Sequence, residues 1–89
     1  MQQSQTQLLL TWLKDVIPVF FEPMHDRIQE FINKERLGQK QFGYLGQMVF
    51  DDLLEHLEPE YQPPQIEPHL VDWEAIGQFL VQKLGLKLW

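Results

Sequence analysis

The side chains able to carry out chemistry are few in this chain, and their spacing matches no common active site. Glu22 and His25 form one half of the Glu-x-x-His pattern that holds di-iron centres in helical bundles, but no second copy occurs. Asp52 and His56 stand at i, i+4 and could share a metal ion, although that spacing more often means a surface ion pair. We therefore expect no metal and no cofactor. A helical-bundle metalloprotein is the second of two alternatives to the function predicted below.

The chain also has few side chains that could act as nucleophiles in catalysis. The chain has no cysteine, and its only alkyl hydroxyl groups belong to Ser4, Thr6 and Thr11. Gly43-x-x-Gly46 lacks the lysine and the serine or threonine that complete a phosphate-binding loop. The sequence therefore predicts a protein that is not an enzyme.

The charge of the chain is acidic and unevenly placed. Seven lysines and arginines stand against 13 aspartates and glutamates, a net charge of −6, which is the wrong sign for binding nucleic acid through its phosphates. Residues 1–44 carry five basic and five acidic side chains, whereas residues 45–89 carry two and eight. All eight of those carboxylates fall within residues 51–74, where there is no lysine or arginine. The second half of the chain thus holds the whole net charge.

A helical stripe of carboxylates is the strongest candidate for a binding surface. Asp51, Glu55 and Glu58 recur at helical spacing, so they would share one helix face. Such a face would steer a partner with a basic patch, although it could also serve only to keep a small protein soluble. Because tyrosine and tryptophan are frequent interface anchors, we add Tyr61 and Trp89 to the predicted partner-binding residues.

The predicted function is a non-catalytic protein–protein interaction module, such as an adaptor, assembly factor or regulator, that binds a basic and apolar partner surface. The alternative is an acidic mimic of nucleic acid that inhibits a DNA-binding protein. Trp12 and Trp73 could also be anchors, but core positions are the favoured interpretation for both. A homodimer would extend the core of so short a chain.

The expected location is the cytoplasm, because the chain lacks cysteine and its N-terminus has no signal-peptide pattern. The apolar stretch 8–21 is interrupted by charges and by Pro18, and it is shorter than the roughly 20 residues of a membrane span. We expect no membrane span.

The elements that must position these residues follow from the spacing of apolar side chains. The period predicts a single all-α domain over residues 1–89, an antiparallel bundle in outline, with four helices at residues 6–17, 23–37, 41–58 and 72–84. A strand over residues 41–49 is the competing interpretation, because Gly43 and Gly46 weaken a helix there. If the segment is helical, these glycines should have a packing reason or mark a late start of the helix.

The segment between the last two predicted helices is a proline-rich linker. Residues 59–68 contain four of the six prolines, which exclude a helix and favour an extended chain. Asp72 would then cap the last helix and Gly85 would end it. The apolar tail, residues 86–89, is expected to dock on the domain or to form a short edge strand.

Overall fold

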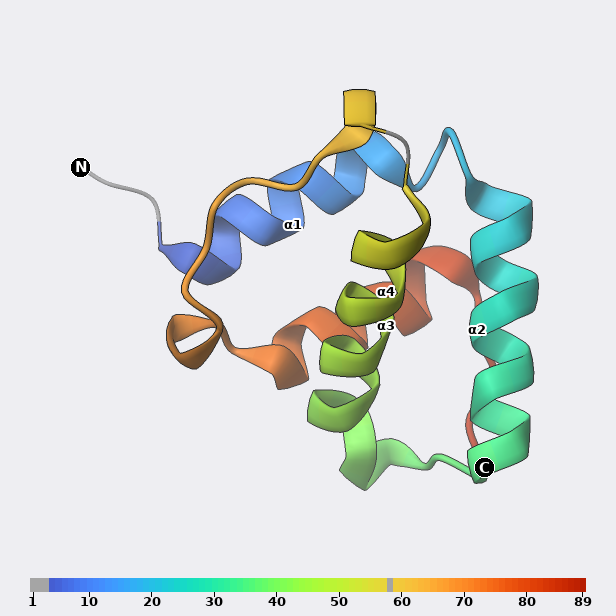
Figure 1. The fold of residues 1–89 in the computed structure, drawn as a ribbon. Coiled ribbons are helices and arrows are strands. Elements are labelled where there is room, and N and C mark those ends of the chain that lie inside the picture. Colours follow the sequence, from blue (N-terminus) through green and yellow to red (C-terminus); the bar gives the residue numbers. More distant parts are fainter. Residues whose placement is uncertain (1–3, 58) are drawn as a thin grey trace.

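The chain folds into an all-α domain, as predicted. In the computed structural model, which describes residues 4–57 and 59–89, the α-helices are α1 (Gln5–Val16), α2 (Phe21–Glu35), α3 (Phe42–His56) and α4 (Trp73–Leu84) (Figure 1). Three short 3₁₀ turns join them: η1 (Gln39–Gln41), η2 (Pro59–Tyr61) and η3 (Pro68–Leu70). The described residues form no strand, so the strand considered for residues 41–49 is wrong. No described helix is long and apolar enough to cross a membrane.

The helix ends differ from the predicted ones by one or two residues, except that α4 ends at residue 84 as predicted. Ser4 caps α1, where its hydroxyl accepts a hydrogen bond from the Gln7 N–H at 3.1 Å. α2 was predicted to end at residue 37, next to Gly38, but it ends at Glu35 and the left-handed residue is Arg36, with φ 54°. Ending the helix there turns Leu37 into the core, where it is 2% exposed. Gly85 is left-handed and ends α4, as predicted.

The linker also departs from a fully extended path. Its ends form the 3₁₀ turns η2 and η3, and only the segment between them lacks helical turns. This segment runs along α1 (Figure 1), and two backbone N–H groups tie the connection to the start of that helix. The Glu67 N–H donates to Gln5 Oε1 at 2.9 Å, and the Asp72 N–H donates to Thr6 Oγ1 at 2.8 Å.

α4 is the central helix of the domain. It packs against α1, α2 and α3, and most extensively against α3. In Figure 1 α2 and α3 run in opposite directions, and α4 crosses behind α3. Each helix places apolar side chains in one common core, and those at most 1% exposed are Leu9, Ile32, Leu45, Ile76 and Leu80.

Glycines bring α3 and α4 together. A Cβ atom at Gly46 would lie only 2.6 Å from the Trp73 carbonyl oxygen and 2.9 Å from the Gly77 nitrogen. A Cβ atom at Gly77 would lie 2.7 Å from the carbonyl carbon of Phe42. The packing reason expected for Gly46 is therefore its close approach to the backbone of α4. Gly43 is different, since its Cβ would meet the Glu74 nitrogen at an ordinary 3.8 Å.

The two tryptophans assigned to the core do pack against it. Both are partly buried, and the Phe50 ring lies between them, 6.2 Å from Trp12 and 5.5 Å from Trp73 between ring centroids. The Trp73 indole N–H donates to the Pro68 carbonyl oxygen at 3.0 Å. The Trp12 indole N–H is buried and has no hydrogen-bond partner among the described residues, an arrangement that costs about 1–3 kcal/mol.

The tail docks on α2. The Gln29 side-chain amide pairs with the backbone of Lys87: its nitrogen donates to the carbonyl oxygen at 2.9 Å, and its oxygen accepts from the N–H at 2.8 Å. The Trp89 N–H donates to the Leu37 carbonyl oxygen at 2.9 Å. Leu86 is buried at the start of this segment. The expected docking is thus confirmed, and the tail joins the end of α4 to the end of α2.

Replacing Asp72 by alanine should test the cap of α4. Its carboxylate oxygen Oδ1 accepts a hydrogen bond from the Ala75 N–H at 3.2 Å, and Ala would leave that donor unsatisfied. We expect Asp72→Ala to lower the free energy of unfolding by about 1 kcal/mol. Urea denaturation followed by circular dichroism would measure the loss. Asp72→Asn keeps the acceptor and should restore most of the stability; equal losses in both variants would contradict the capping role.

Candidate partner-binding surface

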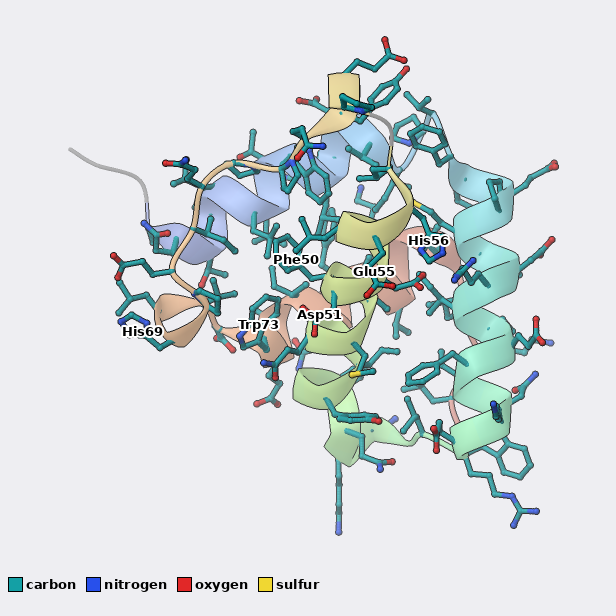
Figure 2. All side chains as sticks on the ribbon, in the orientation of Figure 1. Phe50, Asp51, Glu55, His56, His69 and Trp73 are labelled. Atoms are coloured by element: carbon teal, nitrogen blue, oxygen red, sulfur yellow. The ribbon has the colours of Figure 1, made fainter. Side chains whose placement is uncertain are left out.

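The acidic candidates on α3 lie on an exposed helix face. Asp51 and Glu55 are exposed and stand one turn apart (Figure 2). Tyr44 and Met48 precede them on the same line at i, i+4 spacing, and they are 47% and 38% exposed. We call Tyr44, Met48, Asp51 and Glu55 the α3 ridge. One half of this ridge is apolar and the other half is acidic.

The ridge carboxylates differ from the neighbouring Asp52. Asp52 accepts from Arg27 of α2 through both of its oxygens, at 2.7 Å from Nε and 2.9 Å from a terminal guanidinium nitrogen. Asp51 and Glu55 form no ion pair with any described residue. Their charge is therefore available to an outside partner, whereas that of Asp52 holds two helices together.

His56 completes the bridge between α2 and α3. Its Nδ1 lies 2.9 Å from the Asp52 backbone carbonyl oxygen, which requires a proton on that nitrogen. Its Nε2 then accepts from the Arg27 guanidinium at 3.2 Å. His56 Nδ1 also lies 3.4 Å from a carboxylate oxygen of Asp52, as the i, i+4 spacing predicted, but the closer charged partner of Asp52 is Arg27 of α2.

A groove runs between α2 and α3 beside the ridge, and the Arg27–Asp52 bridge divides it into two hollows. The larger has a volume of about 370 Å³ and is bordered by Phe31 and Lys34 of α2 and by Met48. The smaller has a volume of about 200 Å³ and lies toward the start of α2. The side chains that border it but not the larger hollow are Phe20, Pro23, Met24, Leu53, His56 and Leu57.

The structure does not bring all of the predicted site residues together. Glu58 lies outside the described residues. Tyr61 is partly buried, and its ring packs edge-on against Phe20 at the start of α2, 5.0 Å between centroids. Trp89 is hydrogen-bonded to Leu37 beyond the other end of α2, a helix about 22 Å long. Tyr61 and Trp89 are therefore too far apart to belong to one small partner-binding site.

Trp89 nevertheless remains an exposed aromatic side chain. It is 63% exposed, although its indole N–H donates to Asn33 Oδ1 at 3.3 Å. The Arg36 guanidinium carbon lies 5.4 Å from the ring centroid, so a basic side chain contacts this ring. Among the predicted site residues, Asp51 and Glu55 alone are shown to share a surface.

The residues considered for chemistry have other contacts. His25 Nδ1 lies 3.1 Å from Asp26, and no group of three or more possible metal ligands occurs among the described residues. The Thr11 hydroxyl donates to a carbonyl oxygen of its own helix at 2.9 Å. Together with the cap at Ser4 and the acceptor at Thr6, the hydroxyls engage the backbone.

Sequence reasoning missed the apolar half of the ridge. The predicted stripe consisted of Asp51, Glu55 and Glu58, whereas helical spacing also leads back from Asp51 to Met48 and Tyr44. Leu54, another apolar residue of α3, is also 45% exposed. The spacing of Tyr44 and Met48 was thus present in the sequence as a signal, whereas their exposure was not. The chain matches no protein-family model, and no curated protein or solved structure is significantly similar to it.

Proposed function

We propose that this protein is a small, non-catalytic interaction module, an adaptor, assembly factor or regulator, and that the α3 ridge contacts its partner protein. The observation that carries the proposal is that exposed apolar side chains and unpaired acidic side chains lie together along one face of α3. Tyr44 and Met48 supply apolar area, and Asp51 and Glu55 supply charge. A basic and apolar partner surface would complement both halves.

Each half of the ridge would have a separate role in binding. Apolar side chains at the centre of a contact provide most of the affinity when they leave water, and aromatic residues are prominent among them. Carboxylates at the rim orient the partner and speed its approach. Because Asp51 and Glu55 have no ion pair within the described chain, binding would not require an existing pair to break.

Neutralising the acidic half should weaken partner capture. We expect the double variant Asp51→Asn/Glu55→Gln to retain at least about tenfold less partner from native lysate than the wild type, because two complementary charges are removed. The measurement is affinity capture at low and high salt with mass spectrometry of the retained proteins. High salt should reduce capture by the wild type more than capture by the variant.

The matched control removes two charges from another exposed helix surface. Glu22→Gln/Asp26→Asn changes the net charge equally, at i, i+4 positions of α2 that do not border the groove. This control should keep the partner set of the wild type. If the same partners survive both the ridge variant and high salt, the ridge charges do not contribute and the proposal fails.

A further inference from the structure

We infer that the groove between α2 and α3 receives an amphipathic helix of the partner protein. This inference rests on the proposed function and specifies it. The helix would carry two large apolar side chains seven residues apart, one for each hollow, and lysine or arginine residues along the flank that faces Asp51 and Glu55.

The division of the groove supports two anchors rather than one. Both hollows share Ile28 and Val49, which are 5% exposed, as their apolar floor. The Arg27–Asp52 ion pair borders both hollows and carries no net charge. An apolar side chain placed over that bridge would bury charged groups, whereas side chains on either side of it would meet apolar walls.

The distance between the hollows matches the repeat of a helix. Met24 borders only the smaller hollow and Phe31 borders only the larger one. They stand seven residues apart on α2, which is two turns or about 10 Å. A helix lying along the groove presents side chains at i and i+7 with the same separation, as in other helix-in-groove complexes.

The charges around the groove differ between its two sides, although Asp51 and Glu55 themselves border neither hollow. On the α3 side, Met48 borders the larger hollow, and Asp51 and Glu55 follow it on the ridge without ion pairs among the described residues. On the α2 side, Glu30 and Lys34 border the same hollow and balance each other. A helix with one basic flank would therefore gain charge complementarity along α3 alone.

Defined peptides test this inference independently of the natural partner. The probe is an alanine-based helical peptide with leucine at i and i+7 and lysine along one flank. Lysines on one flank are sufficient, because the peptide can bind in the direction that turns this flank toward α3. Its controls replace both leucines by alanine, or all flank lysines by glutamate. Binding is measured by fluorescence anisotropy and located by amide chemical shifts of the labelled protein.

We expect the leucine and lysine peptide to shift amides of α2 and α3 around the groove, and either control to bind at least about tenfold more weakly. Met48→Ala should weaken binding about tenfold, since it removes a wall of the larger hollow. Leu54→Ala is the matched control, because Leu54 is similarly exposed on α3 but does not border the groove. Its binding should be unchanged.

Several results would overturn the inference. These are absence of peptide binding, equal binding of the three peptides, shifts away from the groove, or equal effects of Met48→Ala and Leu54→Ala. Sedimentation of the free protein would reject it if a dimer buries the groove. If the ridge variant loses its lysate partner while no peptide binds, the proposed function stands and the helical occupant is wrong.

Discussion

Replacing Gly77 by alanine should lower the free energy of unfolding by about 3 kcal/mol, because the new methyl group would meet backbone atoms of Phe42 that cannot rotate away. Alanine favours helices by up to about 1 kcal/mol over glycine, so the helix propensity alone would predict a gain in stability rather than a loss. For a domain of this size, the melting temperature should fall by about 10–20 °C. Calorimetry or thermal denaturation would measure it.

Two other glycines make the test of the helix crossing specific. Gly46→Ala should also destabilise the domain, since its Cβ would approach the Trp73 carbonyl oxygen and the Gly77 nitrogen. Gly43→Ala has room for a methyl group, and it should leave the stability unchanged or raise it. Equal effects of Gly43→Ala and Gly77→Ala would show that α3 and α4 do not approach as closely as described.

Truncating Leu80 to alanine should lower the free energy of unfolding by about 3–4 kcal/mol. Leu80 is fully buried in α4, which packs on the other three helices. The loss combines transfer of the removed atoms to water with the cavity left behind. Small domains are stable by only about 5–15 kcal/mol, so this variant would lose a large share of its stability. Urea denaturation gives the measurement.

Leu70→Ala is the control for the core truncation. Leu70 belongs to η3 and is 56% exposed, so its side chain loses little contact with water on folding. We expect its effect to stay within about 0.5 kcal/mol. A loss at Leu70 as large as that at Leu80 would contradict the assignment of the core to α4.

The helices could be predicted because their signals are local. Apolar residues recur at the helical period, Asp72 offers a cap, and Gly85 offers a left-handed stop. The end of α2 was missed because its cause is not local. Gly38 has the better intrinsic preference for a left-handed conformation, but the chain turns at Arg36, and Leu37 is thereby buried. Burial of one leucine outweighed the glycine signal.

The candidate surface could be predicted only in part for a similar reason. The carboxylate stripe follows from spacing within one helix, so Asp51 and Glu55 were found. The groove depends on the separation of α2 from α3 and on an ion pair between Arg27 and Asp52, which are 25 residues apart. The helical period carries no information about either. The role of Gly77 could not be predicted from the sequence either, because its contact with Phe42 is made between two helices.

The hydrogen bonds between the tail and α2 have a consequence for local unfolding of the domain. α2 faces α3 across a groove, and its contact with α4 is much smaller than that between α3 and α4. Gln29 and Leu37 fasten α2 to the tail beyond α4. Because proteins open in cooperative units, we expect α2 and the tail to separate together, at a lower free energy than the α3–α4 pair. A helix seated in the groove would join the two units, so that their amide hydrogens would exchange with solvent together.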